Sequence, residues 1–250
     1  MKPLPPKQKA RLQGQELEYL IVGQGSPTLV LINGAGGPID GWLRVWEPLS
    51  ALGTVFAYNR PGIGGSAKPV VAQTGDVIVE SLRALLRHAQ LSPPYVLVGH
   101  SLGGLAVNLF ARNHPEEVSG VVLLDATAPE DVGVMASHQS GFQRFTQRAL
   151  DALFGKDEHG ETEHVSRTVE LIQRAGPFPD VPLVVVTGGE PAMAWATPAE
   201  ALAARAEHQR RLAALSPRGR QLMASRSGHF PQLTEPAVVV EAVRLVTTGG

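Results

Sequence analysis

The chain has 250 residues and a mass of 26.5 kDa, with 43% hydrophobic and 18% charged residues, which fits one large globular domain or a domain with an insertion. Its net charge of −1 and isoelectric point near 6.7 give no indication of a nucleic-acid surface or a polybasic membrane patch. The sequence has no cysteine, which excludes disulfides, thiolate metal sites and a cysteine nucleophile.

The first residues, 1–15, are basic and proline-rich, and they lack the apolar segment of a secretory signal. No apolar run elsewhere approaches the length of a membrane span. We therefore expect a cytoplasmic protein with no membrane span and no nucleic-acid partner.

Short apolar runs predict the strands of a sheet. Their apolar residues follow one another instead of alternating with polar ones, which is typical of parallel strands covered on both faces. In chain order the runs are Thr28–Ile32, Thr54–Tyr58, Tyr95–Gly99, Val118–Asp125 and Leu183–Thr187, with a shorter one at Gln221–Ser225. An earlier amphipathic segment, Glu16–Val22, is expected to pair with Thr28–Ile32 as an antiparallel start to the sheet.

Helical patterns lie between these runs. Val77–His88 carries valines and leucines at helical spacing, and Asp76 is expected to cap its start. Further helices are predicted over Leu102–Asn113 and over Glu235–Val246, the latter with Pro236 in its first turn. The alternation of strands and helices predicts an α/β fold with a mostly parallel sheet.

Residues 129–179 interrupt this alternation. The segment has no convincing strand and reads as helical and polar, with Gly155 and Gly160 as breaks. We interpret it as a small helical cap inserted over the carboxyl edge of the sheet, which leaves 1–128 and 180–250 as the two parts of the core.

The segment from Gly99 to Gly103, Gly-His-Ser-Leu-Gly, has the G-x-S-x-G arrangement between a predicted strand and a predicted helix. A turn this tight leaves no room for large side chains at the flanking positions, and it presents the hydroxyl of Ser101 above the sheet. A chance Gly-Ser-Gly loop fits this context less well. Ser101 is therefore our candidate nucleophile.

From about Leu17 to Val246 the chain resembles the α/β-hydrolase fold superfamily, in particular its serine esterase and lipase branch. Five motifs carry the resemblance and occur in the superfamily's order: LINGAGG, YNRPGIGGS, GHSLGG, HPEEVSGVVLLDATAP and SGHFPQLTEP. The resemblance implies a twisted, mostly parallel sheet of about eight strands flanked by helices. It also implies that the loop holding His229 delivers a general base to Ser101.

A serine hydroxyl needs a base to become a nucleophile, and the chain offers eight histidines. His100 lies inside the turn itself, where its side chain would point away from the Ser101 hydroxyl. His229 lies on a glycine-flanked loop after a short strand-like run, which agrees with the resemblance. The alternative is that His229 is an ordinary surface loop residue.

Acyl transfer also requires hydrogen-bond donors for the developing oxyanion. One is the backbone N–H of Leu102, which follows the nucleophile. The resemblance places the second in the loop 33–37, at the N–H of Ala35, where many relatives have His-Gly in place of this chain's Asn-Gly. A backbone donor does not depend on that side chain, and Asn33 can hold the loop by hydrogen bonds. Arg60 is expected to brace loops rather than to bind substrate.

The acid that orients the base has two candidates. In most relatives it follows the strand before the last pair, here Leu183–Thr187, but that position falls near Pro191, which cannot serve. Glu190, one residue earlier, has a longer side chain that could reach; the alternative is a solvated loop carboxylate. Asp125 closes the apolar run VVLL, on a strand that lies beside the nucleophile strand in the resembled fold. A carboxylate that is partly buried there needs a partner, and the imidazolium of the base would be that partner. The alternative is that Asp125 caps a helix or turn. We favour Asp125, with Glu190 as the reserve acid.

These residues predict a serine hydrolase that cleaves carboxylic esters through an acyl-enzyme, with no metal and no organic cofactor. Other chemistry on the same triad stays open: C–C bond or lactone hydrolysis, amide or peptide hydrolysis, cofactor-free perhydrolysis, or a lyase reaction. A non-catalytic ligand-binding or signalling relative is a further alternative.

The substrate-binding residues are expected around the nucleophile and in the cap. The candidates are Gly34, His100, Met135, Phe142, Trp195 and Phe230. The apolar residues of the cap could instead pack the cap onto the sheet. Small-molecule esters with small to medium apolar acyl groups are the expected substrates.

Overall fold

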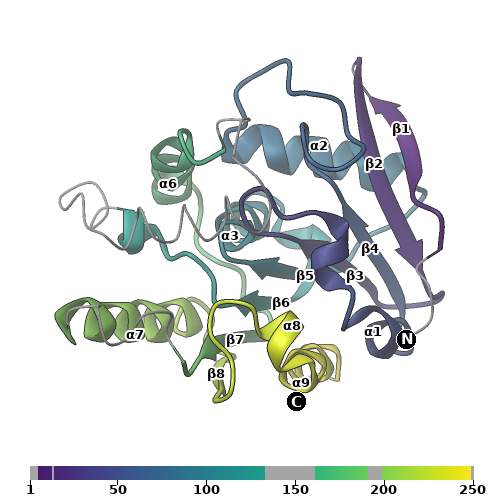
Figure 1. Ribbon diagram of the computed structural model, residues 1–250. Helices are drawn as coiled ribbons and strands as arrows, with labels where there is room; N and C mark the ends of the chain where they lie inside the picture. Colours follow the sequence, from purple (N-terminus) through teal and green to yellow (C-terminus); the bar gives the residue numbers. More distant parts are fainter. Residues whose placement is uncertain (1–4, 13, 133–160, 191–198, 249–250) are drawn as a thin grey trace.

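The computed structural model describes residues 5–12, 14–132, 161–190 and 199–248. An eight-stranded sheet runs through the molecule in the order β1-β2-β4-β3-β5-β6-β7-β8 (Figure 1). From β4 to β8 all neighbouring strands are parallel, which confirms the predicted mostly parallel sheet of about eight strands. The strands are β1 (Gln8–Leu12), β2 (Gln15–Val22), β3 (Thr28–Ile32), β4 (Thr54–Tyr58), β5 (Tyr95–His100), β6 (Val118–Leu124), β7 (Leu183–Gly188) and β8 (Gly219–Ala224).

The antiparallel part of the sheet differs from the prediction. Strand β2 pairs antiparallel with β1 on one side and β4 on the other, while β3 lies beyond β4. The predicted pairing of Glu16–Val22 with Thr28–Ile32 is therefore wrong. The fully buried β4 lies between the two, and its Phe56 stacks on Tyr19 of β2 with 6.0 Å between ring centroids. Strand β1 has no apolar pattern that could mark it, because only Ala10 of its residues is buried.

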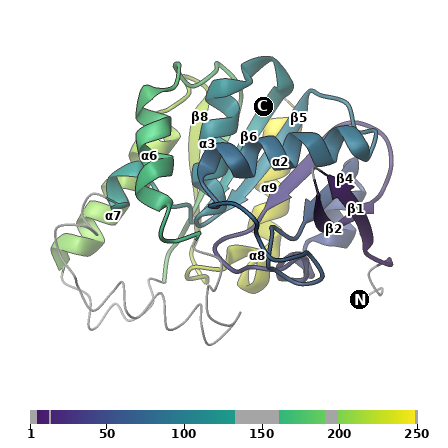
Figure 2. The ribbon, with the colours of Figure 1, turned by 90° about the horizontal axis from the view of Figure 1, so that it is seen from above.

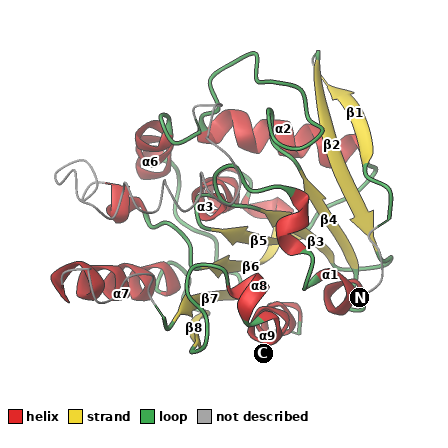
Figure 3. Ribbon diagram, in the orientation of Figure 1, coloured by secondary structure: helices red, strands yellow, loops and turns green. Residues whose placement is uncertain are grey.

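Helices cover both faces of the sheet, as Figure 2 shows from above and Figure 3 by secondary structure. Successive residues of a strand point to opposite faces, so in β3 Val30 packs into one apolar core and Leu31 into the other. This two-sided burial is the reason why the central strands read as continuous apolar runs. The first core includes residues of α2 (Gly75–His88), α3 (Gly103–Asn113), α6 (Val165–Arg174) and α7 (Ala199–Ala213); the second includes residues of η1 (Ile39–Trp42), α1 (Trp46–Ser50) and α9 (Pro236–Thr247).

The start of α2 also differs from the prediction. Thr74 is its N-cap residue, with extended backbone at φ −77° and ψ 162°, so Asp76 does not cap the helix as predicted. Asp76 lies in the first turn instead, where its negative charge suits the helix N-terminus, and it accepts a hydrogen bond from the Thr74 hydroxyl at 2.5 Å. In α9, Pro236 occupies the first turn as predicted, where its missing N–H costs no hydrogen bond.

Helix α6 lies within the predicted insertion and packs against α2 and α3. The backbone N–H of Gly75 donates a hydrogen bond to the Thr168 hydroxyl of α6 at 2.9 Å. Residues 133–160, the larger part of the predicted cap, lie outside the described residues, so the division of the chain into core and cap remains a prediction.

The carboxyl ends of the parallel strands β3, β5, β6 and β7 meet at one edge of the sheet. The loop 33–37, Ser101, Asp125 and Gly188 follow or end these strands, so the fold brings them to one place. The helices of the described ranges include none that is long and apolar enough to cross a membrane.

Candidate active site

Ser101 lies in a tight turn between β5 and α3, and its backbone has a left-handed φ of 51°. The two glycines of the motif are there for steric reasons. A Cβ at Gly99 would lie 2.8 Å from the carbonyl oxygen of Gly103, and a Cβ at Gly103 would lie 2.3 Å from that of Ile32. The turn therefore holds the serine in a backbone conformation that L-residues rarely adopt, as expected of a nucleophile presented above a sheet.

His229 lies beside Ser101, on the loop between β8 and α8 (Pro231–Thr234). Its Nε2 is 3.0 Å from the Oγ of Ser101, and its Nδ1 is 2.8 Å from the Oδ2 of Asp125. The hydroxyl of Ser101, the imidazole of His229 and the carboxylate of Asp125 are thus connected by two hydrogen bonds of ordinary length. The sequence prediction named these three residues, and the fold brings them together.

Asp125 directly follows β6 and is 4% exposed. Its backbone φ of 40° is left-handed, so two of the three non-glycine residues with positive φ in the described ranges are Ser101 and Asp125. One carboxylate oxygen, Oδ1, accepts a hydrogen bond from the backbone N–H of Gly188 at 3.1 Å. The other, Oδ2, lies 2.8 Å from Nδ1 of His229 and 2.5 Å from Nη2 of Arg205.

The charge of Asp125 is well compensated despite its burial. Burial alone raises the pKa of this carboxyl, but the hydrogen bond from His229 and the guanidinium of Arg205 outweigh it and hold the pKa well below its usual range. Asp125 is therefore a carboxylate at neutral pH, which is the form that the role predicted for it would require.

Glu190, the reserve acid, lies after β7 and is exposed. Its backbone N–H donates to the carbonyl of Ser227 at 2.9 Å, and its side chain has no described contact with His229. The end of β7 serves the site differently, because the Gly188 N–H binds Asp125. A Cβ at Gly188 would also lie 2.2 Å from the carbonyl oxygen of Gly228, so the end of β7 and the loop of His229 touch there through backbone atoms alone.

The loop 33–37 passes over Ser101 from the other side. A Cβ at Gly34 would lie 2.9 Å from the Cβ of Ser101 and 3.3 Å from its Oγ. Asn33 holds the loop as expected, since its Nδ2 donates to the carbonyl of Pro38 at 2.5 Å. The loop thus brings the backbone of Gly34, the residue before Ala35, against Ser101.

Arg60 and Glu161 form a buried ion pair beneath this loop, with side chains 2% and 0% exposed. The guanidinium of Arg60 donates to the carbonyl oxygens of Asn33 and Gly34 at 2.9 and 2.5 Å, and Glu161 accepts from the N–H of Gly36 at 3.3 Å. Arg60 therefore braces the loop, which agrees with the role expected for it.

His100, one of the expected substrate-binding residues, is 2% exposed. Its Nε2 lies 2.7 Å from the carbonyl oxygen of His229, and its ring lies against that of Phe230 at 5.2 Å between centroids. Burial, together with the nearby His229, lowers the pKa of His100 to about 3, so its ring is neutral. This placement favours support of the His229 loop over contact with substrate.

The remaining candidate substrate residues are only partly described. Phe230 is half-buried beside His229, and Gly34 lies over Ser101, whereas Met135, Phe142 and Trp195 lie outside the described residues. A cavity of about 10 Å³ lies behind the loop 33–37, lined in part by His100 and Phe230. It has room for about one water molecule and is too small for an acyl group.

Two charged residues of the site were not found from the sequence, Glu161 and Arg205. Glu161 is 101 residues from its partner Arg60, and Arg205 is 80 residues from Asp125, so no local pattern connects them. In α7, Arg205 does share a face with His208, Gln209 and Leu212 at helical spacing, which is a signal for an inward-facing charge.

One group of described residues has the spacing of metal ligands: His114, Glu116 and Glu117, with ligand atoms within 4.8 Å of one another. It lies at the far end of α3 from Ser101, and Glu117 is already paired with Arg83. It has no connection with the residues around Ser101.

Comparisons with known proteins agree with this architecture. Residues 27–167 match the alpha/beta hydrolase fold family. The uncharacterized protein YqjL of Bacillus subtilis (strain 168) is 27% identical over 233 residues, which cover 88% of this chain and 83% of that protein. Three further curated relatives are matched over only 37%, 18% and 36% of their own length.

Solved structures resemble the chain over nearly its whole length. The enol-lactonase from Burkholderia xenovorans LB400 has a TM-score of 0.70 at 20% identity, covering 96% of this chain and 100% of that one. A thermophilic esterase from Thermogutta terrifontis has a TM-score of 0.69 at 20% identity, covering 98% and 99%. At this identity the likeness concerns the fold.

Proposed function

The chain belongs to the alpha/beta hydrolase fold family, and on that premise we propose that it is a serine hydrolase that cleaves carboxylic esters. The observation that carries the proposal is the pair of hydrogen bonds linking Ser101, His229 and Asp125, at 3.0 and 2.8 Å. Serine hydroxyls act as nucleophiles when a base within this range is itself oriented by a third group. A structural neighbour that is described as an esterase supports the same chemistry.

In the proposed reaction, Ser101 Oγ attacks the ester carbonyl while Nε2 of His229 takes its proton. Asp125 holds the imidazole in the required orientation and stabilises the imidazolium. The alcohol then leaves with the proton from His229, and an acyl group remains on Ser101. Water, activated by His229, releases the acid and restores the serine.

The negative oxygen of each tetrahedral intermediate requires donors, and we assign the backbone N–H groups of Ala35 and Leu102. Leu102 directly follows the nucleophile at the start of α3, and the backbone of Ala35 comes near it because the loop 33–37 lies over Ser101. Within the described ranges, neither N–H donates a hydrogen bond to another group. Both are thus available to an oxyanion.

Other substrates would use the same machinery. A lactone is a cyclic ester, and the fold neighbour named an enol-lactonase makes lactone opening the second candidate. C–C bond cleavage, amide or peptide hydrolysis and perhydrolysis rest on the triad alone. A profile of p-nitrophenyl esters from acetyl to palmitoyl, with a set of lactones, ranks these candidates and tests the proposed preference for small to medium acyl groups.

The decisive experiment compares wild type with Ser101→Ala in hydrolysis of p-nitrophenyl acetate and butyrate and in labelling by a fluorophosphonate probe. We expect labelling of the wild type alone and a loss of kcat on the order of 10⁴-fold or more in the variant. Ser166→Ala, an exposed serine on α6, is the matched control and should keep full activity. A wild type that the probe does not label, or a Ser101→Ala variant of normal activity, would contradict the proposal and favour a non-catalytic relative.

A further inference from the structure

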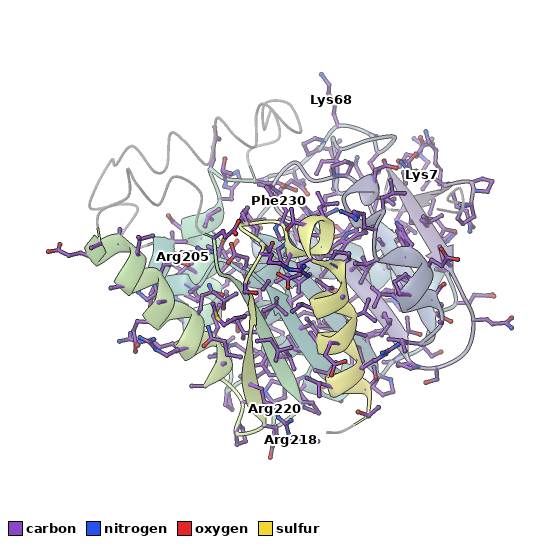
Figure 4. All side chains as sticks on the ribbon, turned by 60° about the horizontal axis from the view of Figure 1, so that its bottom comes forward. Lys7, Lys68, Arg205, Arg218, Arg220 and Phe230 are labelled. Atoms are coloured by element: carbon purple, nitrogen blue, oxygen red, sulfur yellow. The ribbon has the colours of Figure 1, made fainter. Side chains whose placement is uncertain are left out.

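Arg205 on α7 contacts the acid of the triad. Its Nη2 lies 2.5 Å from Oδ2 of Asp125, the same oxygen that binds Nδ1 of His229 at 2.8 Å. A positive charge thus competes with the imidazole for one carboxylate oxygen. Figure 4 shows Arg205 on α7, and it shows Phe230, the neighbour of His229 in the chain, at the start of α8. Arg218 and Arg220 lie away from both, near the start of β8.

The position of Arg205 is fixed by its helix. Helix α7 packs on β7 and β8, and polar side chains of its inward face contact the segment that follows β6. One turn after Arg205, the Nδ1 of His208 lies 2.6 Å from Oδ1 of Asp131, and the Nε2 of Gln209 donates to the carbonyl of Ala126 at 2.8 Å. The side chains of Arg205, His208 and Asp131 are 25%, 12% and 14% exposed. Three contacts from neighbouring helical positions to one short segment hold the guanidinium over Asp125.

We propose that Arg205 is a positioning residue that acts through Asp125 on His229. With Arg205 in place, His229 stays unprotonated, and therefore able to act as a base, down to a lower pH than His229 and Asp125 would allow by themselves. The inference rests on the proposed function, because it concerns the same triad. Its physical basis is that a carboxylate beside an imidazole stabilises the protonated ring, and a cation on the same carboxylate opposes that stabilisation.

The other charged groups around His229 do not supply this effect. They are His100 from β5, Arg60 with Glu161 beneath the loop 33–37, Asp131 with His208 on α7, Glu190 after β7, and Arg226 with Glu235 on the loop of His229 itself. His100 is neutral, because burial and the nearby His229 lower its pKa to about 3. Arg60 and Arg226 each have a carboxylate of their own, and Glu190 is exposed to solvent, which screens its charge.

The sign of the effect follows from the role of His229 as a base. The base works only when it is unprotonated, so activity is lost as pH falls through its titration. Removing the charge of Arg205 strengthens the hold of Asp125 on the imidazolium, and activity should then be lost at higher pH. We expect the acid limb of the profile to move upward, while the activity above that limb changes little.

The test compares Arg205→Gln with Arg205→Lys. Glutamine keeps a hydrogen-bond donor without the charge, lysine keeps both, and Arg205→Met is a second neutral variant in case the glutamine variant does not fold. The matched control is Arg210→Gln, which removes the same charge from an exposed position of the same helix, where Arg210 pairs with Glu207. The measurement is the pH dependence of kcat/KM and of the rate of fluorophosphonate labelling, with thermal unfolding as the check of folding.

The expected result is an upward shift of the acid limb in Arg205→Gln and Arg205→Met, a limb near that of wild type in Arg205→Lys, and no shift in Arg210→Gln. An unmoved limb with activity lowered equally at all pH values would overturn the inference, since Arg205 would then only hold Asp125 in place. An unmoved limb with unchanged activity overturns it as well. Failure of the proposed function would look different, because the wild type itself would then resist the probe.

Discussion

The two sides of Ser101 are each held by an arginine–carboxylate pair, but the pairs differ in burial. On the side of the loop 33–37, Arg60 and Glu161 are 2% and 0% exposed. On the acid side, the side chains of Arg205 and its partner Asp125 are 25% and 5% exposed. Arg60 also donates to two backbone carbonyls, whereas the described contact of Arg205 is to the carboxylate of Asp125.

The difference in burial gives the two arginine–carboxylate pairs different roles, one in the fold and one in protonation. A buried pair recovers its desolvation cost only when both partners and their further hydrogen bonds are in place, so it fixes the shape of the surrounding backbone. A pair that solvent partly reaches contributes less to stability, because water screens it, but it still changes the charge felt by its neighbour. We therefore expect damage to the first pair to disturb the fold, and damage to the second to disturb protonation.

The largest effect is expected from the acid itself. Asp125→Asn keeps the shape of the side chain and tolerates the left-handed backbone, but it no longer fixes or charge-stabilises His229. We expect kcat to fall on the order of 10³- to 10⁴-fold. Steady-state hydrolysis of p-nitrophenyl butyrate measures this.

Glu190→Gln is the matched control for that experiment, since it removes the carboxylate of the reserve acid from the next strand end. Its exposed side chain has no described contact with His229, so activity should stay within about twofold of wild type. The reverse ranking, with Glu190→Gln inactive and Asp125→Asn active, would move the acid to the end of β7.

An intermediate effect is expected from Glu161→Gln. This change leaves the guanidinium of Arg60 buried without its counter-charge, which costs about 3–5 kcal/mol of unfolding free energy. The loop 33–37 also loses part of its brace, so kcat should fall by up to about 10²-fold. Chemical denaturation and steady-state kinetics measure the two effects.

Glu163→Gln, an exposed glutamate near Glu161, is the control and should change neither quantity. If Glu161→Gln lowers stability while kcat stays at the wild-type value, the buried pair supports the fold without positioning the oxyanion donors. The contrast between the two sides of Ser101 would then be one of stability alone.

The smallest of the three effects is expected at Gly188. A Cβ there would lie 2.2 Å from the carbonyl oxygen of Gly228, so Gly188→Ala must displace the residue before His229. We expect a loss of about tenfold in kcat/KM, because a small shift misaligns the base. Gly176→Ala, where the nearest atom would be 3.9 Å away, is the control; equal activity of the two variants would mean that the loop adjusts at no cost.

The nucleophile side of the site could be predicted because its signals are local. The glycines at 99 and 103 flank Ser101 at a fixed spacing, and the apolar run of β6 ends at Asp125, so each could be recognised along the chain. The contact that requires Gly99 lies within the turn, whereas the one that requires Gly103 is with the carbonyl of Ile32 on β3. The choice between Asp125 and Glu190 could be narrowed only because buried carboxylates need partners. The predicted strands and helices mostly matched for the same reason, since periodicity is a local property.

What could not be predicted depends on contacts between distant segments. The partnership of Arg60 with Glu161, and of Arg205 with Asp125, appears only after folding places them together. The insertion of β4 between β2 and β3 is likewise a long-range choice. The cap of α2 lies at Thr74, two residues before the predicted Asp76, which is within the usual variation of helix ends. Sequence patterns therefore locate the candidate catalytic groups better than the groups that support them.

The left-handed backbone of Asp125 limits which residues natural variation or protein engineering can place there. Aspartate and asparagine enter this region at low cost, whereas a β-branched residue would be strained. Glutamate would bring an extra methylene into a space already filled by His229, Arg205 and the N–H of Gly188. A search for relatives that keep this arrangement should therefore ask for aspartate at the end of this strand and for glycine at the end of the next strand, where its N–H binds the carboxylate.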